Sequence, residues 1–151
     1  MAVGEGRDNR IAQLKLVQDA LGANRATLFG RLSDIDEDIK AISLTLGANN
    51  TKVRNLSDQI RSAQGNAKAL NNAYLGSESK IPPGVRAELD RFAKEVDQLN
   101  RLVVELEKAN GYLTKLQATA KADREIVTEN IAATETEQEE ISRKITDLRG
   151  F

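Results

Sequence analysis

The sequence of 151 residues contains no cysteine, no histidine and no tryptophan. Without cysteine there can be no disulfide, no thiol catalysis and no thiolate metal site, and without histidine the commonest general base and metal ligand are missing. No glycine-rich phosphate loop, serine elbow or metal-ligand cluster takes their place. We therefore expect a protein that is not an enzyme and that holds no metal and no cofactor.

Acidic residues are present, but they do not form a recognisable ion site. The densest group consists of Asp34, Asp36, Glu37 and Asp38, and it lacks the turn glycine and the distal glutamate of a calcium loop. On a helix these side chains would point in different directions around the axis. A solvated acidic face is the better interpretation.

An excess of one charge and long apolar runs are also missing. Lysine and arginine total 22 against 23 for aspartate and glutamate, so no general field attracts nucleic acid or anionic lipid. No apolar stretch is long enough to cross a bilayer, and the first residues do not resemble a signal peptide. We expect a cytoplasmic protein with no nucleic-acid partner and no membrane insertion, with a virion or secreted component as the open alternative.

Aromatic residues and proline are scarce. Three phenylalanines and two tyrosines cannot fill a compact core of this size, and the hydrophobic 40% is mostly aliphatic residues and alanine. Charged residues make up 30%, which together with this apolar content is typical of long helices. The prolines are Pro82 and Pro83, so the rest of the chain is free to be helical.

Residues spaced alternately by three and four form two series, one on each side of the prolines. Of the nineteen positions in each series, sixteen in the first and fourteen in the second are apolar, which is a coiled-coil pattern. We call these the seam positions: 11, 14, 18, 21, 25, 28, 32, 35, 39, 42, 46, 49, 53, 56, 60, 63, 67, 70 and 74, then 85, 89, 92, 96, 99, 103, 106, 110, 113, 117, 120, 124, 127, 131, 134, 138, 141, 145 and 148.

The two series predict an all-α fold, a long antiparallel two-helix coiled-coil hairpin that forms one domain over residues 1–151. The helices are expected over about 8–75 and 83–149, with the turn at about 76–82. Gly76 suits a left-handed helix cap, and Pro83 suits a first helical turn. So short a connection favours antiparallel neighbours.

The turn also predicts the register of the seam. With Tyr74 opposite Val85, Ile11 lies opposite Leu148 and Asn49 lies opposite Asn110. A single buried amide left without a partner costs about 1 to 3 kcal/mol, whereas two facing amides can satisfy each other. We interpret Asn49 and Asn110 as a layer that fixes the register, with simple tolerance of two polar residues as the alternative.

Glycines offer a rival architecture. Leu-Gly-Ala-Asn occurs at 21–24 and again at 46–49, and a multi-helix bundle would break at Gly22 and Gly47. The seam pattern runs in phase through both copies, which favours continuous helices. A hairpin that is bent near Gly47 and Gly111 is a further possibility, because these glycines lie at nearly the same height and could form a hinge; they could also be merely tolerated.

Several large apolar residues lie outside the seam, Leu16 and Val17 among them. Scattered surface apolar residues are normal, but this number on a thin hairpin predicts that another surface packs there. A dimer of two hairpins and an amphipathic segment of another protein are the two candidates. The candidate association surface consists of Phe29, Leu44, Leu102, Val104, Tyr112, Leu116 and Ile126.

These features predict a non-catalytic coiled-coil module for protein–protein interaction, acting as an assembly chaperone, adaptor or spacer. The partners would be other proteins and a second copy of the chain, with a dimer favoured. The alternative is a structural building block of a larger assembly such as a phage or secretion apparatus. A contact role is also expected for the tip, formed by Gly76, Glu78, Lys80, Pro82 and Pro83.

Overall fold

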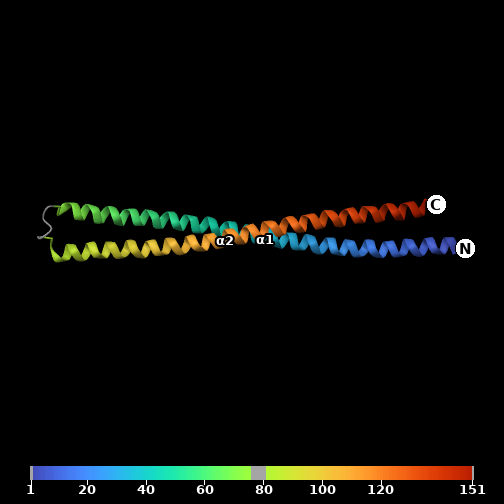
Figure 1. Cartoon of the computed structure of the whole chain (residues 1–151), viewed down its shortest axis with the longest axis horizontal. Helices are drawn as coiled ribbons and strands as arrows, with labels where there is room; N and C mark the ends of the chain where they lie inside the picture. The colour runs from blue at the N-terminus through green and yellow to red at the C-terminus, as the bar shows by residue number, and fades with distance from the viewer. Residues whose placement is uncertain (1, 76–80, 151) are drawn as a thin grey trace. The chain divides into compact units, whose positions relative to one another are not determined.

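The computed structural model describes residues 2–75 and 81–150. Two helices, α1 (Ala2–Ala73) and α2 (Pro83–Arg149), account for nearly all of them (Figure 1). The described ranges contain no strand, and the helices pack against each other. The predicted all-α helical hairpin is confirmed.

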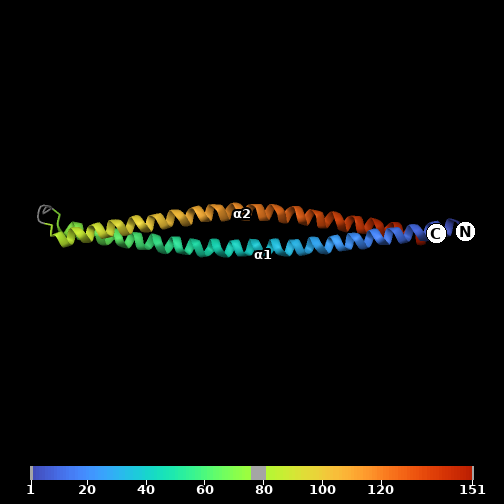
Figure 2. The ribbon, with the colours of Figure 1, turned by 90° about the horizontal axis from the view of Figure 1, so that it is seen from below.

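The chain divides into two compact units, and each unit contains a part of both helices. The first unit comprises Met1–Ala41 with Gln117–Phe151, and the second comprises Ile42–Leu116. Within each unit, a segment of α1 runs antiparallel beside a segment of α2 (Figures 1 and 2).

The bounds of α1 differ from those predicted. The helix begins at Ala2 instead of near residue 8, and it ends at Ala73, where Tyr74 and Leu75 close a turn by bonds to carbonyls three residues back. The prediction started the helix where the apolar pattern starts. Extending a helix that already exists costs little, so polar residues can continue it, and Glu5 in the first turn suits the helix dipole.

The start of α2 is the predicted one. Pro83 opens the helix, where its missing N–H would have had no partner. The carbonyl oxygen of Pro82 accepts bonds from the amides of Val85 at 3.0 Å and Arg86 at 3.1 Å. Gly76, Glu78 and Lys80, the other residues predicted for the tip, lie outside the described residues.

Glycine does not interrupt either helix. Since α1 continues through Gly22 and Gly47, the alternative of a multi-helix bundle is wrong. The continuation of α2 through Gly111 is equally regular. A Cβ atom added at Gly47 or Gly111 would meet open space, so neither glycine is required by close packing. The hinge at these two positions stays a prediction.

Burial follows the seam. Among the described residues, every seam position of α1 is buried or half-buried, and so is every seam position of α2 except Arg124. The most deeply buried side chain is Val127, which is 1% exposed. The other buried residues are Ala63, Leu99, Ile131, Thr134 and Ile145. The core is therefore a single line of side chains between two helices, as the scarcity of aromatic residues predicts.

Candidate functional site

A layer of asparagines crosses the seam in the second unit. The Asn49 Nδ2 group donates to Asn110 Oδ1 at 3.0 Å, and the Asn110 Nδ2 group donates to Asn50 Oδ1 at 3.2 Å. Asn49 and Asn110 are half-buried, so the predicted pair is present. Asn50 was not predicted, although the Asn49-Asn50 doublet is its signal. The proposed role of this layer is to fix the register.

Polar contacts in the first unit obey the same register. Each joins a seam residue to the neighbour of its expected seam partner, because a long polar side chain reaches past the centre of the seam to its edge. The three contacts are Gln18 Nε2 to Ser142 Oγ at 2.6 Å, Arg25 Nε to Glu135 Oε1 at 3.1 Å, and Arg124 Nε to Asp36 Oδ1 at 2.6 Å.

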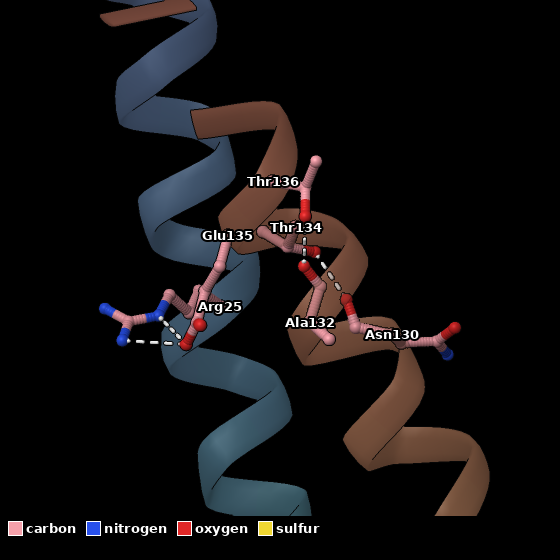
Figure 3. A network of polar contacts seen from close by, with 6 residues as sticks. All are labelled: Arg25, Asn130, Ala132, Thr134, Glu135 and Thr136. Atoms are coloured by element: carbon pink, nitrogen blue, oxygen red, sulfur yellow. Dashed lines mark hydrogen bonds and ion pairs between the residues drawn. The ribbon is translucent and has the colours of Figure 1, made fainter. Parts of the chain in front are cut away.

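Arg25 forms a polar contact with Glu135 of the facing helix (Figure 3). A terminal nitrogen of its guanidinium also lies 3.0 Å from Glu135 Oε1, so two nitrogens share one carboxylate oxygen. The same guanidinium lies over the ring of Phe29, 5.1 Å from its centroid, which is a cation–π distance. One arginine thus spans the seam and also steadies an aromatic residue of the candidate association surface.

Thr134 lies next to Glu135 in the sequence, but its hydroxyl makes no bond to the facing helix. It is a seam residue that is 6% exposed, and its hydroxyl donates to the Asn130 carbonyl of its own helix at 2.9 Å (Figure 3). The exposed Thr136 donates to the Ala132 carbonyl in the same way, at 3.0 Å. Such bonds to the preceding turn satisfy a hydroxyl without any partner on the facing helix.

Arg124 departs from the burial expected of a seam residue. Its side chain is about half exposed and forms an ion pair with Asp36 of α1, which is half exposed too. The aliphatic stem leaves the seam while the charged end stays in water. A pair this exposed contributes little stability.

The candidate association surface is exposed at all seven of its residues, from Leu116 at 39% to Leu44 at 67%. Leu16 and Val17 are exposed as well, as predicted. Leu75, in the turn after α1, was missed, although it too is an apolar residue outside the seam. Each of these side chains keeps between 39% and 73% of its surface exposed.

Three of these residues line up in the second unit. At about 100° per residue, Leu102, Tyr112 and Leu116 fall within about 80° of one another around α2. Tyr112 is 64% exposed and Leu102 is 48% exposed, so the alignment leaves an apolar face open to solvent.

A groove lies beside Leu102 in the second unit. Its volume is about 480 Å³, and seam residues Leu56 and Leu106 are part of its lining. The other lining residues are Lys52, Asn55, Gln59, Leu102 and Glu105. Apolar atoms supply most of the exposed lining, and the two charges stand on different helices.

In residues 2–75 and 81–150, no group of three or more acidic, histidine or cysteine side chains is placed to hold a metal ion. No helix in those ranges has a stretch apolar and long enough to pass through a bilayer. Pro82 and Pro83 are exposed at the tip, where a role in contact stays a prediction.

Comparison with known proteins gives no relative to argue from. No family model, no curated protein and no solved structure matches this chain. The candidate site therefore depends on the chain's own residues: the asparagine layer, the polar contacts of the first unit, and the exposed apolar side chains of both units.

Proposed function

We propose that this chain is a non-catalytic coiled-coil module for protein–protein interaction, an assembly chaperone, adaptor or spacer that works in the cytoplasm. The observation that supports it most is the set of large apolar side chains left in solvent outside the seam. The fold does not need these side chains, because the seam positions already supply its core. Contact with a partner would remove these apolar side chains from solvent.

The energetics favour such contact. Fully burying a leucine contributes about 1.5 to 3 kcal/mol, and the side chains of the candidate association surface still expose 39% to 67% of their surface, so a partner that covers several of them gains part of a specific binding energy. The helices hold the side chains at fixed spacing, so little order has to be imposed on this chain when it binds. An amphipathic helix laid along a groove between helices is the recurring form of this recognition.

Photo-cross-linking in native lysate tests the proposal. A benzophenone amino acid would replace Leu44, Tyr112 or Ile126 one at a time, with Asp58 and Lys108, two exposed charged positions, as matched controls. We expect the apolar positions to yield discrete cross-linked protein products and the charged positions to yield far less. Equal yields from both sets, or no product from any position, would contradict the proposal.

One observation favours the second candidate, a structural building block of a larger assembly. Leu44, Leu102 and Val104 face different directions around their helices, so a single flat partner cannot cover all three. A repeated block would meet several neighbours at once. Light scattering that rises steadily with concentration, without a plateau at a small oligomer, would favour this candidate over the first.

A further inference from the structure

We propose that the apolar face of α2 in the second unit is occupied by a second copy of this chain, and that it packs against α1 of that copy in a two-fold dimer. This inference rests on the proposed interaction function and names its partner. Two stripes on the same side of the seam would form the contact. The α2 stripe consists of Leu102, Glu105, Ala109, Tyr112 and Leu116; the α1 stripe consists of Thr45, Ala48, Lys52, Asn55 and Gln59.

The stripes match in size. The α2 stripe carries large apolar side chains, whereas the α1 stripe has small side chains at Thr45 and at the exposed Ala48 and longer polar side chains at its other positions. The groove beside Leu102 is lined by members of both stripes and would receive side chains from the other copy. Large side chains over small ones allow helices to approach closely and pack at interior density.

The stripes also match in charge. Lys52 is the charged residue of the α1 stripe, and Glu105 is the charged residue of the α2 stripe. Neither residue makes an ion pair with any other described residue. Both residues line the groove, and they lie on different helices. Each could form an ion pair with a residue of opposite charge from another chain.

Two-fold symmetry brings these charges together. An axis parallel to the helices places α1 of one copy antiparallel to α2 of the other and keeps every residue at its height. The Asn49–Asn110 bond fixes those heights in the second unit, and they put Lys52 level with Glu105 to within about one helical turn. The dimer therefore forms the Lys52–Glu105 pair twice, and it places Tyr112 of one copy near Ala48 of the other.

The other exposed apolar residues fit this contact less well. Val104 is as exposed as Leu102, but it points to the opposite flank of α2. Leu44 points away from the seam on the outer side of α1. Neither belongs to a stripe that has a matching stripe on the other helix, and Val104 therefore serves as a control.

Charge exchange gives the sharpest test. By sedimentation velocity on the purified full chain, we expect a dimer for the unaltered protein and weaker dimers, on the order of tenfold or more, for Lys52→Glu and for Glu105→Lys. Each variant places two like-charge pairs in its own homodimer. A mixture of the two variants restores both opposite-charge pairs, so a heterodimer should form, and the double variant should dimerise again. Lys108→Glu, on the outer side of α2, should leave dimerisation unchanged.

A pair of apolar variants supplies the second test. Leu102→Lys should weaken the dimer strongly, while Val104→Lys, at the same 48% exposure and two residues away, should not. Circular dichroism of both variants controls for loss of helix.

A monomeric unaltered chain, or single variants that dimerise as well as it does, would overturn the inference. A mixture of Lys52→Glu and Glu105→Lys that forms no heterodimer would overturn the inference as well. If the purified chain is monomeric while a cross-linker at Tyr112 captures a different protein in lysate, the second copy is the wrong occupant and the proposed function stands. If no position captures any protein, both proposals fail.

Discussion

The two units solve the same packing problem with different side chains. In the second unit the seam contains two polar residues, Asn49 and Asn110, whereas the first unit has six: Gln18, Arg25, Gln117, Arg124, Thr134 and Gln138. Yet most of the deeply buried residues, Val127, Ile131, Thr134 and Ile145, belong to the first unit. The first unit therefore has the more polar seam and also the larger number of deeply buried seam side chains.

Two cross-helix ion pairs lie close to these buried residues. Val127 lies one turn from Arg124, and Ile131 lies one turn from Glu135, and each of those two charged residues pairs with a residue of α1. Both units have a groove of about 500 Å³ beside the seam, but the groove at Leu102 in the second unit has the more apolar lining and adjoins an aligned apolar face. We infer that the aligned apolar face of the second unit is the part of the molecule that depends most on a partner.

The largest expected effect compares core truncations in the two units. Ile131→Ala should lower the free energy of unfolding by about 3 kcal/mol, because it removes most of a side chain that is only 6% exposed. Leu106→Ala, at the half-buried groove of the second unit, should cost less. Urea unfolding followed by circular dichroism measures both.

The control for this experiment is Ile126→Ala, at a site that is 55% exposed, where the change should stay within about 0.5 kcal/mol. If Leu106→Ala proves the more damaging of the two core substitutions, the first unit is not the better covered one.

The next effect concerns the asparagine layer. Replacing both Asn49 and Asn110 by leucine should raise the free energy of unfolding by about 1 to 2 kcal/mol, because two amides are replaced by apolar packing. Asn110→Leu alone should be less stable than the double variant, since it leaves the Asn49 amide without its present partner. Spin-label distances across the second unit should broaden in the double variant; an unchanged, narrow distribution would rule out a role in register.

A smaller effect separates a hinge from tolerated glycines. Gly47→Ala in the second unit and Gly30→Ala in the first both add a methyl group to open space, so each should stabilise its helix by up to about 1 kcal/mol. A hinge predicts in addition that Gly47→Ala slows amide exchange in its neighbours more than Gly30→Ala does. If amide exchange slows equally in the two variants, Gly47 is not a hinge.

The smallest effect belongs to the ion pairs. A double-mutant cycle on Arg25 and Glu135, each changed to glutamine, should give a coupling of about 0.5 kcal/mol, because both side chains are partly exposed. About 1 M salt should remove most of it. A coupling of several kcal/mol that salt does not change would mean that this pair is a buried structural element instead of a cover for the seam.

Much of the fold could be predicted because the apolar spacing and the Pro82-Pro83 turn together determine the seam and its register. The Asn49–Asn110 contact follows from that register, as does the exposure of Tyr112 and Leu44. The early start of α1 could not be predicted, because polar residues that extend an existing helix carry no periodic signal.

The apolar spacing also could not predict how side chains are arranged at the edges of the seam. Arg124 occupies a seam position but turns outward to Asp36, since a long charged side chain can choose between the core and its rim. Spacing alone does not decide that choice. It also could not show that Leu102 and Glu105 line a groove, because a groove depends on how neighbouring side chains fill space.

Site-specific cross-linking of the purified chain tests most directly whether the apolar face of the second unit binds a second copy. A benzophenone at position 102 should yield a covalent product of twice the chain mass, with the cross-linked peptide drawn from residues 45–59 of the other copy. The same probe at position 104, with equal exposure on the other flank, should yield little. Monomer alone from position 102, or equal dimer from both positions, would contradict the account.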